Sequence, residues 1–333
     1  MSHAAWPPGT DRVLVEAPAR LHFGVLDLNG SLGRKFGGIG AAVPSPSLLL
    51  EAARMPDQII ADGEDADRAA EFARRFLVAH GVAGGARIVV HRAIPAHAGL
   101  GSGTQLALAV ARALADLYDL PTEVTALAAA VGRGRRSAIG TWAFAAGGFL
   151  LEGGRREATD TVGPLLARLE MPASWRCVVA VPDAVPGLSG EAEVEAFRRL
   201  PPPPVAETER VAHLVLLKLL PCLAEADLVG FGEALTEIQR ITGAWFAPAQ
   251  GGIFAPGPTQ ELIRLMGGPW GGAGVGQSSW GPAVYGIVEG ADAARELAAR
   301  CRQFLGARGR VWETPFAARG AAIRRVPADA YAD

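Results

Sequence analysis

The sequence predicts an α+β protein of two domains. Its 333 residues are about twice the ~150 residues typical of one domain. Strand-like and helix-like patterns interleave in both halves, without the regular βαβ spacing of a doubly wound fold. The patterns weaken between residues 155 and 170, where we place the domain boundary. We therefore expect a disordered leader at residues 1–10, a first domain at 11–160 and a second at 161–333.

Hydrophobic periodicity indicates the first elements of the chain. Residues 13–17 predict a strand that ends at Pro18, and residues 48–50 predict a second strand after a glycine-rich stretch at 24–40. Residues 65–80 predict a helix that stops at Gly81.

A strand is predicted at residues 87–92, followed by a glycine-rich loop and a long helix. Apolar residues of that helix recur at i, i+4, i+7, i+8 and i+11, which gives one buried stripe. They are Leu106, Val110, Ala113, Leu114 and Leu117. Thr122 is expected to cap a further helix after Pro121.

The second half begins with a predicted strand at residues 175–181. The run Pro201–Pro204 predicts a surface loop. Further helices are predicted at 207–226, 228–243 and 292–305. A glycine-rich loop at 271–281 is expected to precede a strand at 283–289, and a last strand lies around Val311.

The charge balance argues against a partner that binds through bulk electrostatics. Lysine and arginine number 32 against 34 acids, a net charge of −2, so we expect no nucleic acid and no membrane surface as partner. No apolar stretch reaches the ~18 residues of a membrane span. The 3 cysteines form no CxxC pair, which argues against a zinc knuckle or disulfide framework and favours a reducing cytoplasm.

The basic residues are almost all arginines. Lys35 and Lys218 are the 2 lysines of the chain, so a lysine-based mechanism has two candidates. Lys218 lies in an apolar helical run and is expected to extend its ammonium group to solvent.

The strongest local signal is the loop Pro95–Gln105, PAHAGLGSGTQ. Glycines let a backbone approach an anion closely, and the following helix N-terminus adds N–H donors and a positive dipole end. The loop therefore predicts a phosphate site. The alternative is an ordinary turn in which Ser102 or Thr104 caps the helix. The candidate binding residues are Gly99, Gly101, Ser102, Gly103, Thr104 and Gln105.

This loop resembles the second motif of the GHMP superfamily, and Gly272–Gly276 resembles the third. Four further blocks, at residues 17–24, 33–40, 132–140 and 276–282, resemble the β-ribofuranosylaminobenzene 5′-phosphate synthase family, the non-kinase branch. The resemblance implies a two-domain GHMP kinase-like fold, with a ribosomal protein S5 domain 2-like N-terminal domain and a ferredoxin-like C-terminal domain.

The residues themselves argue against a kinase. Phosphoryl transfer in the superfamily commonly uses an aspartate soon after the second motif. Residues 132–151 contain no acid, and Glu152 is the first. Arg133, Arg135 and Arg136 lie there instead, and guanidinium groups suit a polyanionic substrate. A GHMP small-molecule kinase and a non-catalytic binding protein remain the alternatives.

The resemblance implies condensation of 5-phosphoribosyl-1-pyrophosphate (PRPP) with 4-hydroxybenzoate or 4-aminobenzoate, with loss of pyrophosphate and CO₂. The product is a ribosyl C-glycoside used for tetrahydromethanopterin-type cofactors. The resemblance also implies Mg²⁺ as cofactor, with ligands that stay unassigned, and a homodimer.

Candidate catalytic residues are Arg20 and His22, which alternate after the first strand, and Lys35 beside Arg34 in a glycine-rich loop. His22 is equally well explained as a buried structural histidine, and Arg34 with Lys35 as a solvated pair. Trp280 is a candidate for stacking on the aromatic ring or a core anchor. The remaining candidate substrate-binding residues are Arg133, Arg136, Gln277, Ser278 and Ser279.

Overall fold

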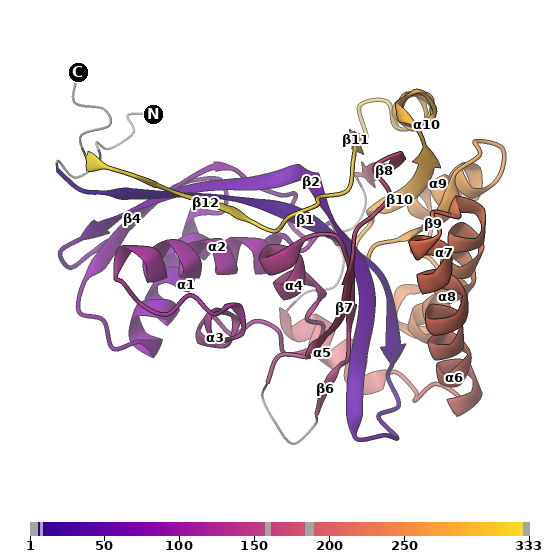
Figure 1. Ribbon diagram of the computed structural model, residues 1–333, viewed down its shortest axis with the longest axis horizontal. Coiled ribbons are helices and arrows are strands. Elements are labelled where there is room, and N and C mark those ends of the chain that lie inside the picture. The colour runs from indigo at the N-terminus through magenta and orange to yellow at the C-terminus, as the bar shows by residue number, and fades with distance from the viewer. Residues whose placement is uncertain (1–5, 7–8, 157–160, 184–189, 329–333) are drawn as a thin grey trace.

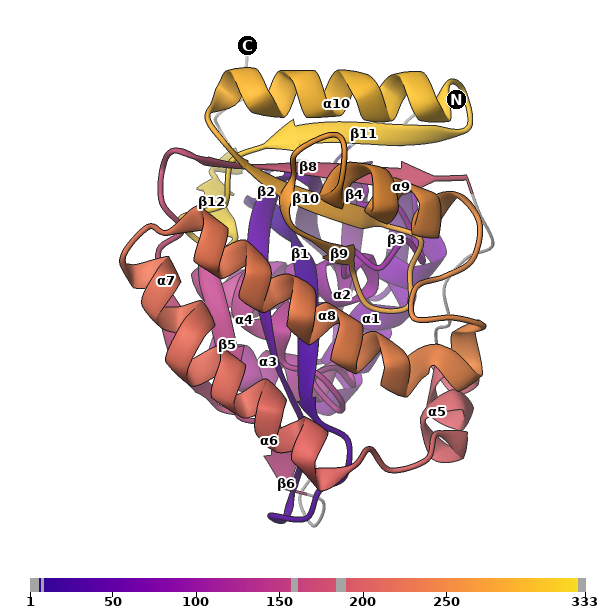
Figure 2. The same cartoon turned by 90° about the vertical axis from the view of Figure 1, so that its right-hand side faces the viewer.

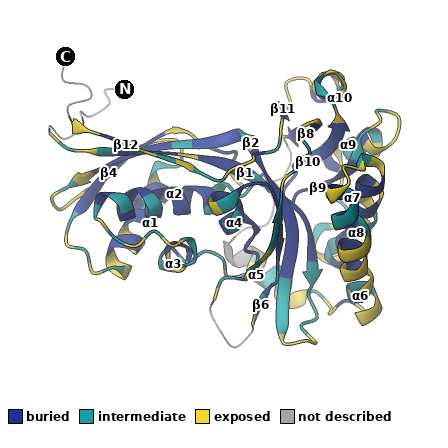
Figure 3. Cartoon of the chain, in the orientation of Figure 1, coloured by how far each residue is buried: buried dark blue, intermediate teal, exposed yellow. Residues whose placement is uncertain are grey.

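The structure is a computed structural model that describes residues 6, 9–156, 161–183 and 190–328, excepting the side chains of 190–193. It contains two β-sheets with helices packed on each, so the predicted α+β class is confirmed (Figure 1). Most of the expected leader at 1–10 lies outside the described residues. The central strands of both sheets are buried, whereas exposed residues gather on the outer faces of the helices and on the edge strand at residues 322–326 (Figure 3).

The first sheet has eight strands, in the order β12-β1-β2-β4-β3, with β5 and β6 paired to β2 and β7 to β5. Its strands are β1 (Arg12–Asp27), β2 (Arg34–Met55), β3 (Ile59–Gly63), β4 (Gly85–Arg92), β5 (Phe149–Glu152), β6 (Arg155–Arg156), β7 (Leu165–Leu169) and β12 (Ala322–Val326). One face is covered by α1 (Ala66–Ala79), α2 (Ser102–Leu117), α3 (Val124–Ala130) and α4 (Ile139–Ala146) (Figure 1).

The second sheet is antiparallel, in the order β11-β8-β10-β9. Its strands are β8 (Trp175–Pro182), β9 (Ala273–Gln277), β10 (Val284–Glu289) and β11 (Gly309–Thr314). Its helices are α5 (Gly190–Arg199), α6 (Val205–Leu214), a π-helical turn (Val215–Leu219), α7 (Leu220–Ala224), α8 (Leu228–Gln250), α9 (Pro258–Gly267) and α10 (Ala291–Leu305). Helices α6, α7 and α8 form an outer layer (Figure 2).

One hydrophobic core joins the two sheets. The ring of Phe23 in β1 lies 4.8 Å from that of Tyr285 in β10. Phe231 of α8 contacts Phe149 of β5 and Trp175 of β8, at centroid distances of 6.3 and 5.0 Å. These five rings come from both parts of the fold, so the two parts are fixed to each other by buried aromatic contacts.

Strands from both ends of the chain contribute to the first sheet. β7 pairs with β5 in the first sheet, and β12, near the end of the chain, pairs with β1 along Arg12–Glu16. This pairing satisfies backbone groups that an open edge of β1 would leave exposed. The first part of the fold is therefore built from both ends of the chain.

The prediction that the first strand ends at Pro18 is wrong, because β1 continues to Asp27. The pairing with β2 shifts register between Pro18 and Ala19, and the pairing with β12 ends at Glu16. Pro18 therefore occupies a position where its missing N–H interrupts no regular ladder. The glycine-rich stretches at 24–40 and 271–281 also contain strand residues, in β1, β2 and β9.

The predicted Thr122 cap is wrong, and neither cap of the alternative interpretation, Ser102 or Thr104, is observed. Gly101 occupies the N-cap of α2, without a side-chain hydrogen bond, in place of Ser102 or Thr104. Glu123 caps α3 in place of Thr122, and its carboxylate accepts from the N–H of Ala126 at 2.9 Å. The remaining predicted helices and strands have counterparts in the structure, whereas nine elements of the described chain were not predicted: β3, α4, β5, β6, β7, α5, α9, β9 and β12.

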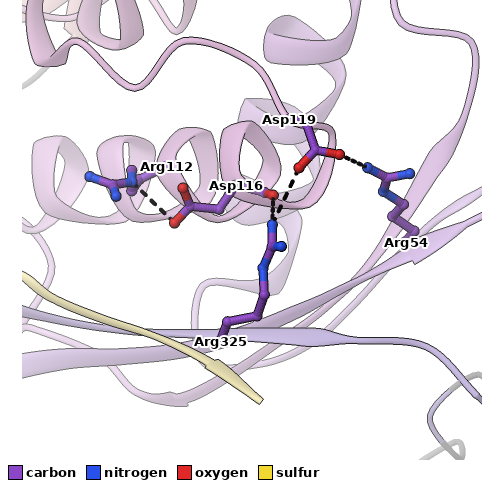
Figure 4. A network of polar contacts seen from close by, with 5 residues as sticks. All are labelled: Arg54, Arg112, Asp116, Asp119 and Arg325. Atoms are coloured by element: carbon purple, nitrogen blue, oxygen red, sulfur yellow. Dashed lines mark hydrogen bonds and ion pairs between the residues drawn. The ribbon is translucent and has the colours of Figure 1, made fainter. Parts of the chain in front are cut away.

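A polar network ties the end of α2 to the sheet (Figure 4). Arg325 of β12 donates to the carbonyl of Asp116, and Arg54 of β2 pairs with Asp119 at 3.2 Å. Arg112 bonds the Asp116 carboxylate at 3.2 Å. The pairs that Asp119 forms with Arg54 and Arg325 are largely exposed, so each contributes about 0–1 kcal/mol and acts mainly by fixing position.

Glycines in β2 create a gap that α4 fills. A Cβ added at Gly40 would lie 2.6 Å from Cγ2 of Ile139, the first residue of α4, and 2.4 Å from the carbonyl oxygen of Leu21. A Cβ at Gly38 would lie 3.3 Å from Nε2 of His22. The start of α4 therefore rests directly on the strand, next to His22.

Glu152 of β5 holds this helix start from the other side. Its buried carboxylate accepts from the N–H of Ala138 at 3.1 Å and from that of Gly154 at 2.8 Å. Burial raises the pKa of Glu152 to about 7, although the two hydrogen bonds act in the opposite direction. The carboxyl group is consequently poised to ionise near neutral pH.

We predict that Glu152→Gln removes a pH-dependent loss of stability. The pKa of the Glu152 carboxyl group is higher in the folded chain than in the unfolded chain, so the unfolded chain ionises first. Glu152 therefore lowers the stability of the wild type as pH rises from about 4.5 to about 7. The free energy of unfolding of the variant relative to the wild type should rise over this window by on the order of 3 kcal/mol.

Urea unfolding at steps between pH 4.5 and 8 measures this difference, with Glu64→Gln at an exposed position as control. The free energies of unfolding of the variant and the wild type should also differ by an amount that does not depend on pH, because an amide cannot accept both backbone hydrogen bonds. A difference that stays constant with pH would contradict the prediction.

Candidate active site

Two loops, one from each part of the fold, meet backbone to backbone. The N–H of Ala283 donates to the carbonyl of Ala98 at 3.1 Å. A Cβ at Gly99 would lie 2.0 Å from the carbonyl oxygen of Ser278, and one at Gly281 would lie 2.1 Å from the nitrogen of Gly99. Only glycines permit this approach. The predicted phosphate loop is thereby fixed to the loop that follows β9.

Ser278 links three segments at this junction. Its buried hydroxyl donates to the carbonyl of Gly99 at 2.6 Å and accepts from the backbone N–H of His22 at 3.0 Å. The structure thus brings Ser278 beside Gly99 and His22, as the sequence predicted for the site. Its hydroxyl is used to join these segments.

Arg20 lies against the same loop. Its backbone N–H donates to Leu100 at 3.1 Å, and its guanidinium donates to the carbonyl of Gly99. A Cβ at Gly101 would lie 2.7 Å from Cγ of Arg20, so the side chain packs under the loop. Arg20 therefore supports the loop conformation and places a positive charge beside it.

His22 is buried, and it is neutral at physiological pH. Its Nε2 lies 3.0 Å from Oγ of Ser137, a residue that the sequence analysis did not identify. Burial, and then the charge of Arg20, lower the pKa of His22 to about 3. At neutral pH the ring therefore offers one N–H donor and one lone pair, and it is a weak base.

The N-terminus of α2 combines several features of an anion site. Gly101, at φ 78°, occupies the N-cap and brings no side chain to the first N–H groups. A Cβ at Gly103 would lie 2.7 Å from Nη2 of Arg68 and 3.2 Å from Nη2 of Arg133. Two guanidinium groups thus add to the positive end of the helix dipole.

Arg68 was not predicted as a site residue. Asp65 and Arg68 have the i,i+3 spacing of an ordinary helix ion pair, and they do form such a pair at 3.0 Å. Arg133 was predicted, and its guanidinium stacks over the ring of Phe72 at 4.9 Å. Arg136 is half-buried in the same connection between α3 and α4. As the sequence indicated, arginines lead into α4 where no carboxylate occurs before Glu152.

Arg34 and Lys35 lie further along the β1–β2 hairpin. In the antiparallel pairing of β2 with β6 they lie opposite Arg156 and Arg155. The guanidinium of Arg34 also donates to the carbonyl of Gly154 at 3.0 Å. In the β1–β2 pairing His22 lies opposite Gly40, whereas Lys35 lies beyond Phe36, which pairs with Asp27 at the far end of the hairpin. The structure therefore does not gather these two residues with His22 and Gly99.

The remaining predicted residues contribute mainly to packing. Gln277 is buried, and its amide oxygen accepts from the N–H of Ala255 at 2.8 Å. Gln105 donates to the carbonyl of Gly140 at 2.8 Å, which joins α2 to α4. Ser279 has a φ of 58°, and its carbonyl accepts from Gln277 at 3.0 Å. These contacts hold the shape of the two loops.

The ring of Trp280 packs in a cluster of aromatic side chains. Its ring is 4.8 Å from that of Phe246 in α8 and 5.5 Å from that of Phe197 in α5. Phe36 continues the cluster at 5.5 Å from Phe197. With 9% of its surface exposed, Trp280 has the environment of a core anchor.

In the described part of the chain, no three His, Cys, Asp or Glu side chains come together as a metal site would require. No helix among the described residues is long and apolar enough to cross a membrane. Lys218 forms an exposed pair with Glu233 at 2.7 Å, as expected of a side chain that extends to solvent.

Comparison with known proteins places this geometry in a family. The family models described as the GHMP kinases N terminal domain and the GHMP kinases C terminal match residues 66–148 and 219–307. Among solved structures, a homoserine kinase from Cytophaga hutchinsonii covers 97% of this chain and 100% of its own, with a TM-score of 0.64 at 16% identity. A Leishmania major (L. major) mevalonate kinase covers 95% and 97%, with a TM-score of 0.66 at 15% identity. At these identities the likeness shows the fold alone.

Curated relatives are closer. The β-ribofuranosylphenol 5′-phosphate synthase of Methanothermobacter thermautotrophicus is 34% identical over 297 residues, which cover 83% of this chain and 89% of the relative. That of Archaeoglobus fulgidus is 35% identical over 287 residues, which cover 83% and 87%. Together with the two domain matches, these relatives show that the chain belongs to the GHMP superfamily and, within it, to the family of the β-ribofuranosylphenol 5′-phosphate synthases.

Proposed function

We propose that the protein condenses PRPP with 4-hydroxybenzoate to a β-ribofuranosylphenol 5′-phosphate, with release of pyrophosphate and CO₂. The printed names of the curated relatives favour the phenol, and therefore 4-hydroxybenzoate over 4-aminobenzoate. The observation that carries the proposal is an arginine-flanked helix N-terminus beside a buried, neutral histidine.

In this proposal the phosphate groups bind at the N-terminus of α2. The free N–H groups after Gly101 and the guanidiniums of Arg68 and Arg133 offset negative charge as pyrophosphate leaves C1 of the ribose. Cleavage of the C1–O bond leaves an oxocarbenium-like carbon, so the site must also exclude water. The contact between the two loops closes this end of the site.

The aromatic carbon that bears the carboxylate then bonds to C1. Electron density from the para oxygen makes this carbon nucleophilic, and loss of CO₂ returns the pair of the broken C–C bond to the ring. A phenol proton that leaves during attack returns after decarboxylation, so the net reaction neither consumes nor releases a proton. The chemistry therefore requires hydrogen bonding at the para oxygen more than it requires a strong base.

His22 suits that need. A neutral imidazole polarises an oxygen by hydrogen bonding without the cost of placing a second charge beside Arg20. This assignment keeps His22 and Arg20 in the site and gives His22 the role of a hydrogen-bonding group.

The described donor set does not form a magnesium site built by the protein. No cluster of three metal-binding side chains occurs among the described residues, and both oxygens of Glu152 bind backbone N–H groups. No step of the proposed reaction therefore depends on a Mg²⁺ site built by the protein alone. The diphosphate oxygens of PRPP are ligands of the kind that Mg²⁺ prefers, so the substrate would bring the metal with it.

The proposal also includes a homodimer and a cytoplasmic location, both carried by the sequence resemblance and the reducing environment inferred from the cysteines. The three cysteines are free thiols in the structure, and two of them are buried.

Analytical ultracentrifugation measures the oligomeric state, and a monomer at micromolar concentration would contradict the dimer.

Incubation of the purified protein with PRPP, Mg²⁺ and carboxyl-labelled 4-hydroxybenzoate should release labelled CO₂ and pyrophosphate in equal amounts. Parallel reactions with 4-aminobenzoate measure the preference between the two rings. Absence of CO₂ release, together with ATP consumption on a small alcohol, would instead identify a kinase.

We expect Arg133→Gln and Arg68→Gln to raise the KM for PRPP. Loss of a hydrogen bond to a charged group costs about 1.5–3 kcal/mol, which corresponds to an increase of about 10- to 150-fold. The KM for the benzoate should change less than about threefold, because the phosphate site is affected first.

Steady-state kinetics in each substrate measure the two KM values. Arg74→Gln, also on α1 but paired with Glu71 on an exposed surface, is the matched control and should behave as wild type. Equal increases in both KM values would show that the arginines shape the site without contacting phosphate.

A further inference from the structure

We propose that Ser137 is a positioning residue that sets the tautomer of His22, by donating its hydroxyl hydrogen to Nε2 and leaving the ring proton on Nδ1. The inference rests on the proposed function for its kinetic consequence, whereas its geometry and its first test do not. Neither the sequence motifs nor the comparisons assign a role to this serine.

The contacts of the Ser137 hydroxyl decide the direction of the hydrogen bond. In the described part of the chain, Oγ has two partners, Nε2 of His22 at 3.0 Å and the N–H of Ile139 at 3.2 Å. The N–H of Ile139 can only donate, so Oγ accepts there. The hydroxyl hydrogen then points to Nε2.

The opposite direction is less favourable. If Nε2 carried the proton, Oγ would accept two hydrogen bonds, and its own hydrogen would have no acceptor among the described residues. Leaving a polar hydrogen unsatisfied at a half-buried position costs free energy. A neutral imidazole has one lone pair and one N–H, and the pKa of about 3 means that His22 is neutral at pH 7.

Contacts of the neighbouring residues fix the positions of Ser137 and His22. Gly38 and Gly40 leave room above β2 for the ring of His22 and for Ile139. Glu152 accepts from the N–H of Ala138, the residue next to Ser137. Ser278 holds the backbone of His22 from the opposite part of the fold. Both ends of the Ser137–His22 hydrogen bond are therefore anchored by other groups.

With its tautomer fixed, His22 presents one defined hydrogen-bond donor to the substrate. With Nε2 engaged by Ser137, Nδ1–H is the group through which His22 can bond an oxygen, and a fixed tautomer avoids a mixture in which part of the enzyme presents a lone pair instead. The class of ligand is an anionic or electron-rich oxygen, such as the para oxygen of the benzoate.

Nitrogen-detected NMR of the free protein tests the tautomer directly. Nε2 of His22, assigned with a His22→Gln variant, should show the shift of an unprotonated nitrogen at pH 7. Ser137→Ala should move a measurable share of the proton to Nε2, whereas Ser137→Thr, which keeps the hydroxyl, should leave it on Nδ1. A wild-type ring protonated on Nε2, or a ring unaffected by Ser137→Ala, would overturn the proposal.

Kinetics test the consequence. Ser137→Ala should lower kcat by about 10- to 100-fold, as other partners that orient a functional group do, with the KM for PRPP within about twofold of wild type and activity restored in Ser137→Thr. An unchanged kcat in Ser137→Ala would overturn the positioning role. A wild type inactive with PRPP would contradict the proposed function and leave the tautomer result intact. Thermal unfolding of each variant confirms that the compared proteins are folded.

Discussion

The contact between the loop at residues 98–101 and the loop at 278–283 is the constraint on which the site depends. Because the N–H of Ala283 bonds the carbonyl of Ala98, and glycines at 99 and 281 let the backbones touch, the two parts of the fold meet within one hydrogen-bond length. Ser278 then reaches Gly99 and His22 at the same time. The shared aromatic core behind this junction prevents the parts from separating, so a site composed of residues far apart in sequence keeps one geometry.

A second constraint is the absence of side chains along part of β2. In most sheets a helix packs on side chains, whereas here Gly40 lets the beginning of α4 approach the strand itself, and Gly38 leaves room for the ring of His22. This brings Ser137 to His22 and the N–H of Ala138 to Glu152. Two glycines of the block at residues 33–40, Gly38 and Gly40, are thus explained by close packing, and they need no contact with substrate to be required.

Charge is distributed in a way that suits a substrate with phosphates. Arg68 and Arg133 lie at the N-terminus of α2, while the buried groups nearby, His22 and Glu152, have pKa values shifted toward their neutral forms. A low-dielectric interior disfavours isolated charge. Positive charge therefore lies on the arginines around the N-terminus of α2, Arg20 included, and not on the buried histidine. Such an arrangement favours departure of a diphosphate more than strong acid–base chemistry.

Local sequence determined the α+β class, the long buried stripe of α2, the glycine-rich loop before that helix and the absence of acids before Glu152, because these depend on periodicity and on residue type at short range. It also identified Arg20, His22, Ser278 and Arg133 near the site. Only the tertiary structure decided that Lys35 lies along a hairpin, that Trp280 packs in an aromatic cluster, and that Arg68, Ser137 and Glu152 belong beside the site. Those positions depend on strand pairing and on packing between residues distant in the chain, which no local pattern encodes.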